Sequence, residues 1–340
     1  MTNTKNEHYH ARSLKIAGLC IFLALASFFP AQADIYAFGD SLTDVGNIYA
    51  ATGGAAPGAP YVNGQFTNGK VWVQDLASDL GLAPLTPSLL GGTDYAYGTA
   101  ESGVTAFNTS APNTDLTGAT GQLAQYQATH ATADPHALYT IWIGSNDLSD
   151  ILTGQLPSQY GGDIGAVVGN IDSAVSTLAG MGAKNFLILT VPDLGKTPEV
   201  LAGGPAESAG ASFLSGIFDT ALTNGIPALA AADSVNISVV NTYALLDTIV
   251  ANPASYGFSN VTQPCLTGEV NYAGGTPCAN PSQHLFWDQL HPTAAGQEIV
   301  AGEALAQVTP EPSFISLIAV GLIGMVILRL RSAGRQAVTR

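Results

Sequence analysis

The sequence predicts an α/β protein built as a three-layer α/β/α sandwich, and two patterns support this class. Four short runs are apolar at nearly every position, which is typical of strands buried on both faces of a parallel sheet. Between these runs lie longer segments with apolar residues at helical spacing. Strands that alternate with helices along a chain build a sheet that is covered by helices on both faces.

The expected elements follow from these patterns. The runs predict strands at 34–38, 138–143, 185–191 and 235–240. Helical spacing predicts helices at 164–181, 211–232 and 293–308. Pro227 is expected to break or kink the second helix, because proline removes one helical hydrogen bond. Stretches rich in Gly, Pro, Asn and Ser predict long loops at 50–65, 88–120 and 252–284.

The N-terminus has the pattern of a signal peptide. Three cations precede an apolar run of about 14 residues and an A-x-A site: Lys5, Arg12, Lys15, then 16–29, then 31–33. This order predicts export, with cleavage after Ala33 by a signal peptidase. The alternative is an uncleaved anchor helix, for which the apolar run is short. Residues 1–33 are therefore assigned to a signal peptide.

The C-terminus has a second processing pattern. Pro310-Glu311-Pro312 precedes an apolar run at 314–328, and four arginines close the chain: Arg329, Arg331, Arg335 and Arg340. Such a run can span a bilayer with its basic end in the cytoplasm. Residues 310–340 resemble the PEP-CTERM sorting signal of Gram-negative bacteria, which implies transient anchoring, cutting by an exosortase, and a final place in the cell envelope, at the surface or in the medium. The alternative is a plain single-pass anchor.

The remaining residues, 34–309, form one predicted domain with a strongly acidic charge. Of the 25 acidic residues of the chain only Glu7 and Glu311 lie outside it, and it contains three lysines and no arginine, so its formal charge is −20. This charge repels phosphate backbones and anionic membrane surfaces. Nucleic acid is therefore excluded as a partner.

Two cysteines, Cys265 and Cys278, fall within this domain, and Cys20 lies in the signal peptide. Two cysteines in an exported chain most simply form one disulfide. No spacing pairs them with histidines in the manner of a metal site.

Two short blocks follow predicted strands, and a third contains a glycine of interest. Ser41 follows the first strand in Gly39-Asp40-Ser41-Leu42, and Asn146 follows the second in Gly144-Ser145-Asn146-Asp147. The carboxyl ends of parallel strands are where open α/β folds place their active sites. Gly98 lies in a third block, 94–100, where a glycine lets the backbone approach a reacting atom. Taken singly, each block also reads as a helix cap, a turn or a loop glycine.

Asp288 and His291 form the last block, three residues apart and directly before a predicted helix. A carboxylate this near can accept from one imidazole nitrogen and leave the other free to act as a base. The alternative is a capping aspartate beside a surface histidine. Among the other histidines of the domain, His284 is the rival candidate.

Together the blocks resemble those of the GDSL, or SGNH, hydrolase family, and the resemblance extends from Asp34 to about Val308. Its residues are 39–42, Gly98, 144–147 and 288–291, and 65–72 also resembles a segment of the longer members. Asp94 stands where many relatives have asparagine, and Thr99 where many have a second glycine.

The resemblance implies a flavodoxin-like sheet of mainly five parallel strands, with neither a metal nor an organic cofactor. It implies a Ser41–His291–Asp288 triad and an acyl-enzyme, with the oxyanion bound by the Ser41 and Gly98 N–H groups and the Asn146 side chain.

The expected function is hydrolysis of carboxylic esters, whether lipids or small esters. The first alternative is a carbohydrate O-acetyl esterase that trims exopolysaccharide, so that the substrate is an acetylated sugar. The second belongs to another class: a non-catalytic surface or matrix protein on a hydrolase fold. The sequence does not determine the natural ester, its acyl length or the oligomeric state.

Overall fold

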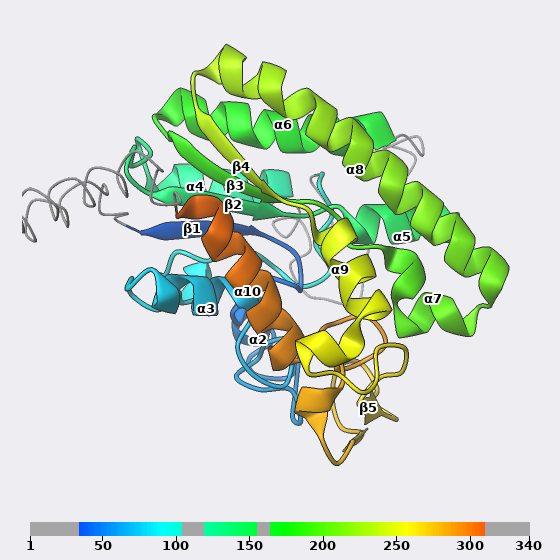
Figure 1. Ribbon diagram of the computed structural model, residues 1–340. Coiled ribbons are helices and arrows are strands. Elements are labelled where there is room, and N and C mark those ends of the chain that lie inside the picture. Colours follow the sequence, from blue (N-terminus) through cyan, green and yellow to red (C-terminus); the bar gives the residue numbers. More distant parts are fainter. Residues whose placement is uncertain (1–33, 104–118, 155–163, 310–340) are drawn as a thin grey trace, which may run out of the picture.

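A computed structural model describes residues 34–103, 119–154 and 164–309 of the protein (Figure 1). At its centre lies a sheet of four parallel strands in the order β1-β2-β3-β4: Ile35–Gly39, Leu138–Trp142, Asn185–Leu189 and Asn236–Val240. All four coincide with predicted strands. The predicted α/β class and parallel sheet are therefore confirmed.

The expected fifth strand is replaced by an irregular segment, so the predicted strand count is too high by one. Residues 93–97 run beside β1 and exchange three backbone hydrogen bonds with it: Ala37 N to Thr93 O at 3.0 Å, Tyr95 N to Ala37 O at 2.7 Å, and Tyr97 N to Gly39 O at 3.2 Å. Only Ala37 and Asp94 pair as a bridge. This segment holds the edge of the sheet beside the end of β1 without forming a full ladder.

Nine α-helices are described, together with short 3-10 turns at Ser88–Leu90, Leu194–Lys196, Pro253–Tyr256 and Pro281–Gln283 and a two-stranded ribbon. They are α2 (Asn47–Ala51), α3 (Trp72–Asp79), α4 (Ala119–Thr129), α5 (Ser145–Thr153), α6 (Ile164–Met181), α7 (Pro198–Ala202), α8 (Pro205–Asp233), α9 (Thr242–Ala251) and α10 (Ala294–Val308). The ribbon pairs β5 (Leu266–Thr267) with β6 (Thr276–Pro277). Cys265 and Cys278 flank it and are joined in a disulfide. It lies inside the predicted loop 252–284.

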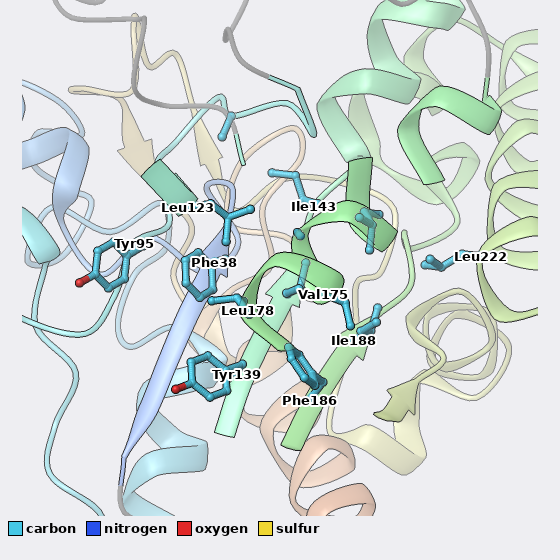
Figure 2. Close-up of a cluster of buried hydrophobic side chains, with 14 of the residues drawn as sticks. Phe38, Tyr95, Leu123, Tyr139, Ile143, Val175, Leu178, Phe186, Ile188 and Leu222 are labelled. Atoms are coloured by element: carbon cyan, nitrogen blue, oxygen red, sulfur yellow. The ribbon is translucent and has the colours of Figure 1, made fainter. Parts of the chain in front are cut away.

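The first face of the sheet is covered by α4, α6 and α8. Figure 2 shows Val175 and Leu178 of α6 packed against Tyr139, Phe186 and Ile188 of the strands, all within one buried apolar cluster. Successive side chains of a strand point to opposite faces, so each apolar strand supplies both cores. This cluster forms the first of two cores.

The second face is covered by α3 and α10, which lie against each other (Figure 1). Trp72 and Leu76 of α3 pack with Val300 of α10 in a second cluster, against strand residues that include Ala37 and Leu189. The two cores make the three layers that the sequence predicts.

The bounds of the predicted helices agree with the structure to different degrees. The bounds of α6 are those predicted, and α10 begins one residue later than expected because Thr293 is its N-cap and accepts from Gly296 N. Of the break or kink expected at Pro227, the break is wrong, because α8 starts at Pro205 and continues through Pro227 to Asp233; the kink stays a prediction. Its buried residues Leu222 and Ile226 hold this stretch against the first core on the N-terminal side of the proline.

Among the described helices, α6 alone is long and apolar enough to span a membrane. Its apolar residues pack on the sheet, including Val167, Ile171 and Val175, so it is a core helix of the domain. The predicted signal peptide, 1–33, and the predicted sorting signal, 310–340, lie outside the described residues.

Candidate active site

Ser41 lies one residue beyond Asp40 in a tight turn at the carboxyl end of β1. The turn is closed by the Asp40 carbonyl, which accepts from the N–H groups of Thr43 and Asp44, both at 3.0 Å. The Asp40 side chain accepts from Leu42 N at 2.9 Å. A Cβ atom on Gly39 would come within 2.5 Å of the Trp142 carbonyl oxygen, so only glycine allows β1 to lie this close to β2 before the turn.

The structure brings Ser41, His291 and Asp288 together as the sequence predicts. His291 Nε2 lies 2.7 Å from Ser41 Oγ, and His291 Nδ1 lies 2.8 Å from Asp288 Oδ2. The exposed fractions are 9% for Ser41 and 3% for each of the other two. The distances and the order of contacts fit a nucleophile, a general base and an orienting carboxylate.

A local turn positions the histidine relative to the aspartate. Asp288 Oδ1 accepts from Leu290 N at 2.9 Å and from His291 N at 2.7 Å, as aspartates do when they cap a turn. The Trp287 N–H donates to the His291 carbonyl at 2.7 Å and closes the turn from the other side. Three residues of separation therefore suffice to place the carboxylate against the imidazole.

The pair is also matched electrostatically. Burial raises the pKa of Asp288, but the charge of His291 and its hydrogen bonds outweigh burial and hold the pKa below its usual value. Burial lowers the pKa of His291, but the charge of Asp288 and its hydrogen bond outweigh this, so the net pKa is raised. The carboxylate thus favours the protonated imidazole, which is the state that forms when a base takes the serine proton.

Tyr61 is a fourth member of this cluster that sequence reasoning missed. Its hydroxyl donates to Asp288 Oδ2 at 2.8 Å, and its exposed fraction is 5%. Burial raises the pKa of Tyr61, and the Asp288 charge raises it further, so the phenol stays protonated. Tyr61 lies in the predicted loop 50–65, where no periodic pattern marks it. No signal in the sequence separates it from the other loop residues.

The predicted oxyanion donors fall into two groups. Ser41 and Asn146 both line the cavity at the site, because α5 begins at the edge where Gly39 of β1 pairs with Trp142 of β2. The Asn146 amide donates to the Ala100 carbonyl at 2.7 Å, which fixes its orientation. An amide has two N–H bonds, so one such contact leaves a second for another acceptor.

Gly98 is placed differently. Its N–H donates to Asp44 Oδ2 at 2.8 Å, and a Cβ atom on it would lie 2.4 Å from the Phe66 ring. Glycine is thus required for close packing against Phe66. The hydrogen bond to Asp44 uses the N–H that the sequence assigned to the oxyanion, so the oxyanion role of Gly98 stays a prediction.

His284, the rival histidine, is not among the residues that line the cavity at Ser41. Its Nδ1 is 3.4 Å from Cys278 Sγ and 3.2 Å from the Asn280 carbonyl oxygen. With Cys265 and Cys278 it forms the one group of metal-ligand side chains found among the described residues. The two sulfurs are bonded to each other, so neither is a free thiolate ligand.

A cavity of about 120 Å³ opens on Ser41 and His291. Apolar lining comes from α9, the loop before Asp288, and α10: Leu245, Leu246, Ile249, Leu285, Phe286 and Val300. Polar lining from α5 and α7 includes Ser145, Asn146, Ser149 and Glu199. The site therefore pairs the Ser41, His291 and Asp288 side chains with a largely apolar chamber, which is the usual composition of a small-molecule site.

The family model described as GDSL-like Lipase/Acylhydrolase matches residues 35–304 of this chain. A GDSL esterase/lipase of Arabidopsis thaliana is 27% identical over 314 residues, which cover 78% of this chain and 85% of that protein. The thermolabile hemolysin of Vibrio parahaemolyticus is 29% identical over 291 residues, covering 80% of this chain and 62% of the hemolysin.

Esterase EstA of Pseudomonas aeruginosa is 30% identical over 331 residues, which cover 84% of this chain and 49% of EstA. The chain thus spans less than two thirds of the bacterial relatives named here. Among solved structures, the acetylxylan esterase Axe2 of Geobacillus stearothermophilus aligns with a TM-score of 0.44 at 14% identity, covering 83% of this chain and 98% of Axe2.

Proposed function

The chain belongs to the family of GDSL-like lipases and acylhydrolases and is a carboxylic ester hydrolase, and on this premise we propose that Ser41, His291 and Asp288 are its catalytic triad. One observation carries the proposal: His291 Nε2 lies 2.7 Å from Ser41 Oγ while Nδ1 contacts Asp288. In this arrangement the imidazole base reaches the serine nucleophile, and a carboxylate orients the imidazole.

The proposed reaction has two halves. His291 takes the proton of Ser41 Oγ as that oxygen attacks the ester carbonyl, and Asp288 stabilises the imidazolium. His291 then gives this proton to the leaving alcohol, and an acyl-enzyme on Ser41 remains. A water that gives its proton to His291 attacks the acyl-enzyme, and His291 returns this proton to Ser41 Oγ as the bond to the acyl group breaks and the acid leaves. The Ser41 N–H and the Asn146 amide are the proposed oxyanion donors, with the Gly98 N–H as a third if its bond to Asp44 is given up.

We propose that the acyl chain of the ester occupies the apolar end of the cavity, beneath α9. Leu246 and Ile249 lie on that wall, and both are buried residues of a third apolar cluster. Apolar surface favours an acyl chain of several methylenes over an acetyl group, because each buried methylene contributes about 0.8 kcal/mol. The chamber thus favours an esterase or lipase over a sugar deacetylase.

Hydrolysis of p-nitrophenyl acetate, butyrate and palmitate by the purified protein, beside a Ser41→Ala variant, tests both proposals. Butyrate is expected to exceed acetate in kcat/KM, and all turnover is expected to vanish in the variant. Turnover that survives in Ser41→Ala would remove Ser41 from the site. Activity on acetyl esters alone would favour a deacetylase of acetylated sugars, and no turnover on any ester would favour a non-catalytic surface protein.

An Ile249→Trp substitution tests the acyl position. The larger ring is expected to fill the chamber, which lowers kcat/KM for butyrate about tenfold and changes that for acetate little, since a methylene or two are worth 1–3 kcal/mol in such pockets. Ile217→Trp, on the exposed side of α8, is the matched control. Equal losses on both esters would contradict this placement.

We further propose that the protein is exported and processed at both ends. The patterns at 1–33 and 310–340 support a signal peptidase, an exosortase and a final place at the cell envelope or outside it. The mass of the mature protein from its host tests both cuts. A mature chain that still contains 314–340 would leave a simple membrane anchor in place of a sorting signal.

A further inference from the structure

The Tyr61 hydroxyl and the Asp288 carboxylate form a buried contact that the proposed reaction does not use directly. We infer that Tyr61 is a positioning residue of the active site: its phenol donates to Asp288 Oδ2 and thereby fixes the orientation and the effective charge of the carboxylate that holds His291. This inference rests on the proposed triad. It adds a residue from the N-terminal part of the domain to a pair that lies near its C-terminal end.

The two oxygens of Asp288 are held in different ways. Oδ1 accepts from the Leu290 and His291 N–H groups, both within the same turn. Oδ2 accepts from Tyr61 and, at 2.8 Å, from His291 Nδ1, which also lies 3.0 Å from Oδ1. Without the phenol, Oδ2 would keep the imidazole as its hydrogen-bond partner in the buried site. A buried carboxylate oxygen that loses a donor is destabilised, and the carboxylate is then held by the bonds on Oδ1 and by the imidazole.

Tyr61 is itself held largely by the disulfide-linked hairpin. Two backbone hydrogen bonds join the segment before Tyr61 to the tip of the hairpin. Gly58 N donates to Tyr272 O at 2.9 Å, and Gly274 N donates to Ala59 O at 2.8 Å. The Tyr61 ring meets the rings of Tyr272 and Trp287 edge to face, with centroids 6.2 Å apart in both cases. The phenol is therefore held by the hairpin and by the ring of Trp287.

The hairpin in turn is tied to the catalytic turn. Leu266 N donates to the Trp287 carbonyl at 2.6 Å, and Cys265 N donates to the Phe286 carbonyl at 3.0 Å. The Cys265–Cys278 disulfide closes the base of the same hairpin. The Tyr61 phenol and the Asp288 carboxylate are therefore both attached to the hairpin, which holds them in contact.

The phenol also moderates the pull of Asp288 on His291. A donor on Oδ2 draws part of the negative charge of the carboxylate, so its removal strengthens the attraction for an imidazolium. The other groups that face His291 are Asp40 at the end of β1 and Glu199 on α7, with the Tyr272 and Phe66 rings beside it. None of these four changes when Tyr61 loses its hydroxyl.

The test is Tyr61→Phe, which keeps the ring and its packing. The His291 imidazole is titrated by nitrogen NMR, with its signals assigned from a His291→Gln variant. The His291 pKa and the acid limb of kcat/KM are both expected to move to higher pH, and kcat is expected to fall about tenfold, the scale of one hydrogen bond to a charged group. Unchanged titration and an unmoved acid limb would overturn the inference, because a purely structural loss lowers turnover at every pH.

Tyr126→Phe is the matched control. It removes one buried phenol hydroxyl, which lies 3.2 Å from the Tyr139 hydroxyl in the first core. Thermal unfolding of both variants reports the loss of stability that the two share. The control is expected to leave the His291 titration and the acid limb in place.

A double variant separates positioning from general damage. In an Asp288→Ala background the acceptor is gone, so adding Tyr61→Phe is expected to lower kcat less than twofold. A loss in that background as large as in the wild type would show that Tyr61 does not act through Asp288. The NMR titration needs no turnover, so it tests Tyr61 even if the ester panel fails and the proposed function falls.

Discussion

Asp288 and Asp219 are two buried aspartates whose carboxyl groups respond in opposite ways to burial. Their exposed fractions are 3% and 7%. The pKa of Asp288 is lowered, whereas burial raises the pKa of Asp219 to about 7, which hydrogen bonds from Thr190 and Val191 only partly offset. Asp288 has an imidazole beside it, and Asp219 has another acid, Asp193, near it.

The difference teaches that hydrogen bonds alone do not keep the pKa of a buried carboxyl group at its ordinary value in this domain. Asp40 and Asp44 support the same view: both are held by backbone N–H groups, yet burial raises their pKa values to about 7 and about 6. A nearby cation is what reverses the effect of burial at Asp288. Cations are scarce, since residues 34–309 contain three lysines and no arginine. The cation beside Asp288 is the protonated form of a histidine, His291.

The largest expected effect comes from the same substitution at the two aspartates. Asp288→Asn is expected to lower kcat on p-nitrophenyl butyrate by about 10⁴, because the amide stabilises the wrong imidazole tautomer and no imidazolium. Asp219→Asn, on α8, is expected to change kcat less than threefold. Comparable losses in both variants would show that the ionised carboxylate at Asp288 is not the source of the difference.

The second prediction concerns stability against pH. The folded pKa of Asp219 is about 7 and its ordinary value is 3.8, so between these values the folded state binds more protons than the unfolded state. The free energy of unfolding therefore falls as pH rises from about 4 to 7, by up to about 4 kcal/mol for three pKa units. Asp219→Asn is expected to flatten this fall in urea unfolding at pH 4.5, 6 and 7.5.

The contribution of Asp288 to the free energy of unfolding changes with pH in the opposite direction. Its folded pKa lies below the ordinary value, so its contribution is present above about pH 4 and is lost as the pH falls further. Asp288→Asn should therefore remove a loss of stability on the acid side. If both Asn variants altered the same pH range, the two carboxyl groups would not differ as described.

The third prediction addresses the hairpin, which supports Asp288 and does not contact Asp219. Replacing Cys265 and Cys278 together by serine opens a loop with a separation of 13 residues and is expected to lower the free energy of unfolding by about 3 kcal/mol on the chain-entropy model. Thermal unfolding with and without reductant measures this. A wild-type Tm that reductant leaves unchanged, from protein shown to be reduced, would contradict it.

The smallest effect is expected at Lys196, a cation at the surface. Its ammonium lies 3.8 Å from Asp193 and 3.9 Å from Asp247, and its side chain is 35% exposed. The Asp193 side chain is 1% exposed but also accepts from Gly195 N, and ion pairs whose cation is open to water contribute about 1 kcal/mol or less. Lys196→Met is expected to change the free energy of unfolding by less than that, and the change should shrink in 1 M salt. A larger, salt-independent loss would make this cation comparable to the one at Asp288.

Features that depend on residues close together in the sequence were predictable. The strands are apolar on both alternations because both faces are buried, so they stand out without tertiary information. The turns around Ser41 and around Asp288 and His291 are closed by contacts within four residues, and short motifs record such contacts. The sequence therefore predicts the sheet and the three residues of the proposed triad.

Features that depend on distant partners were not predictable. Tyr61 meets Asp288 across 227 positions, and the Gly98 N–H is claimed by Asp44 across 54. Residues 93–97 form the sheet edge through three backbone bonds rather than through a strand pattern. The helix α8 continues through Pro227 because its side chains are anchored in the core, and local propensity gives no sign of that.

The hydrogen bond between Ser41 and His291 joins residues 250 positions apart. If Ser41 and His291 act as proposed, a ribosome produces the nucleophile early and its base late, and a nascent chain that stops short of His291 has the serine turn without its base. The proposed pair comes together only when the last turn before α10 docks against the end of β1. The order of synthesis would thus delay the reaction until the sheet between them is complete, and any copy of the domain that lacks His291 is expected to be inert toward esters.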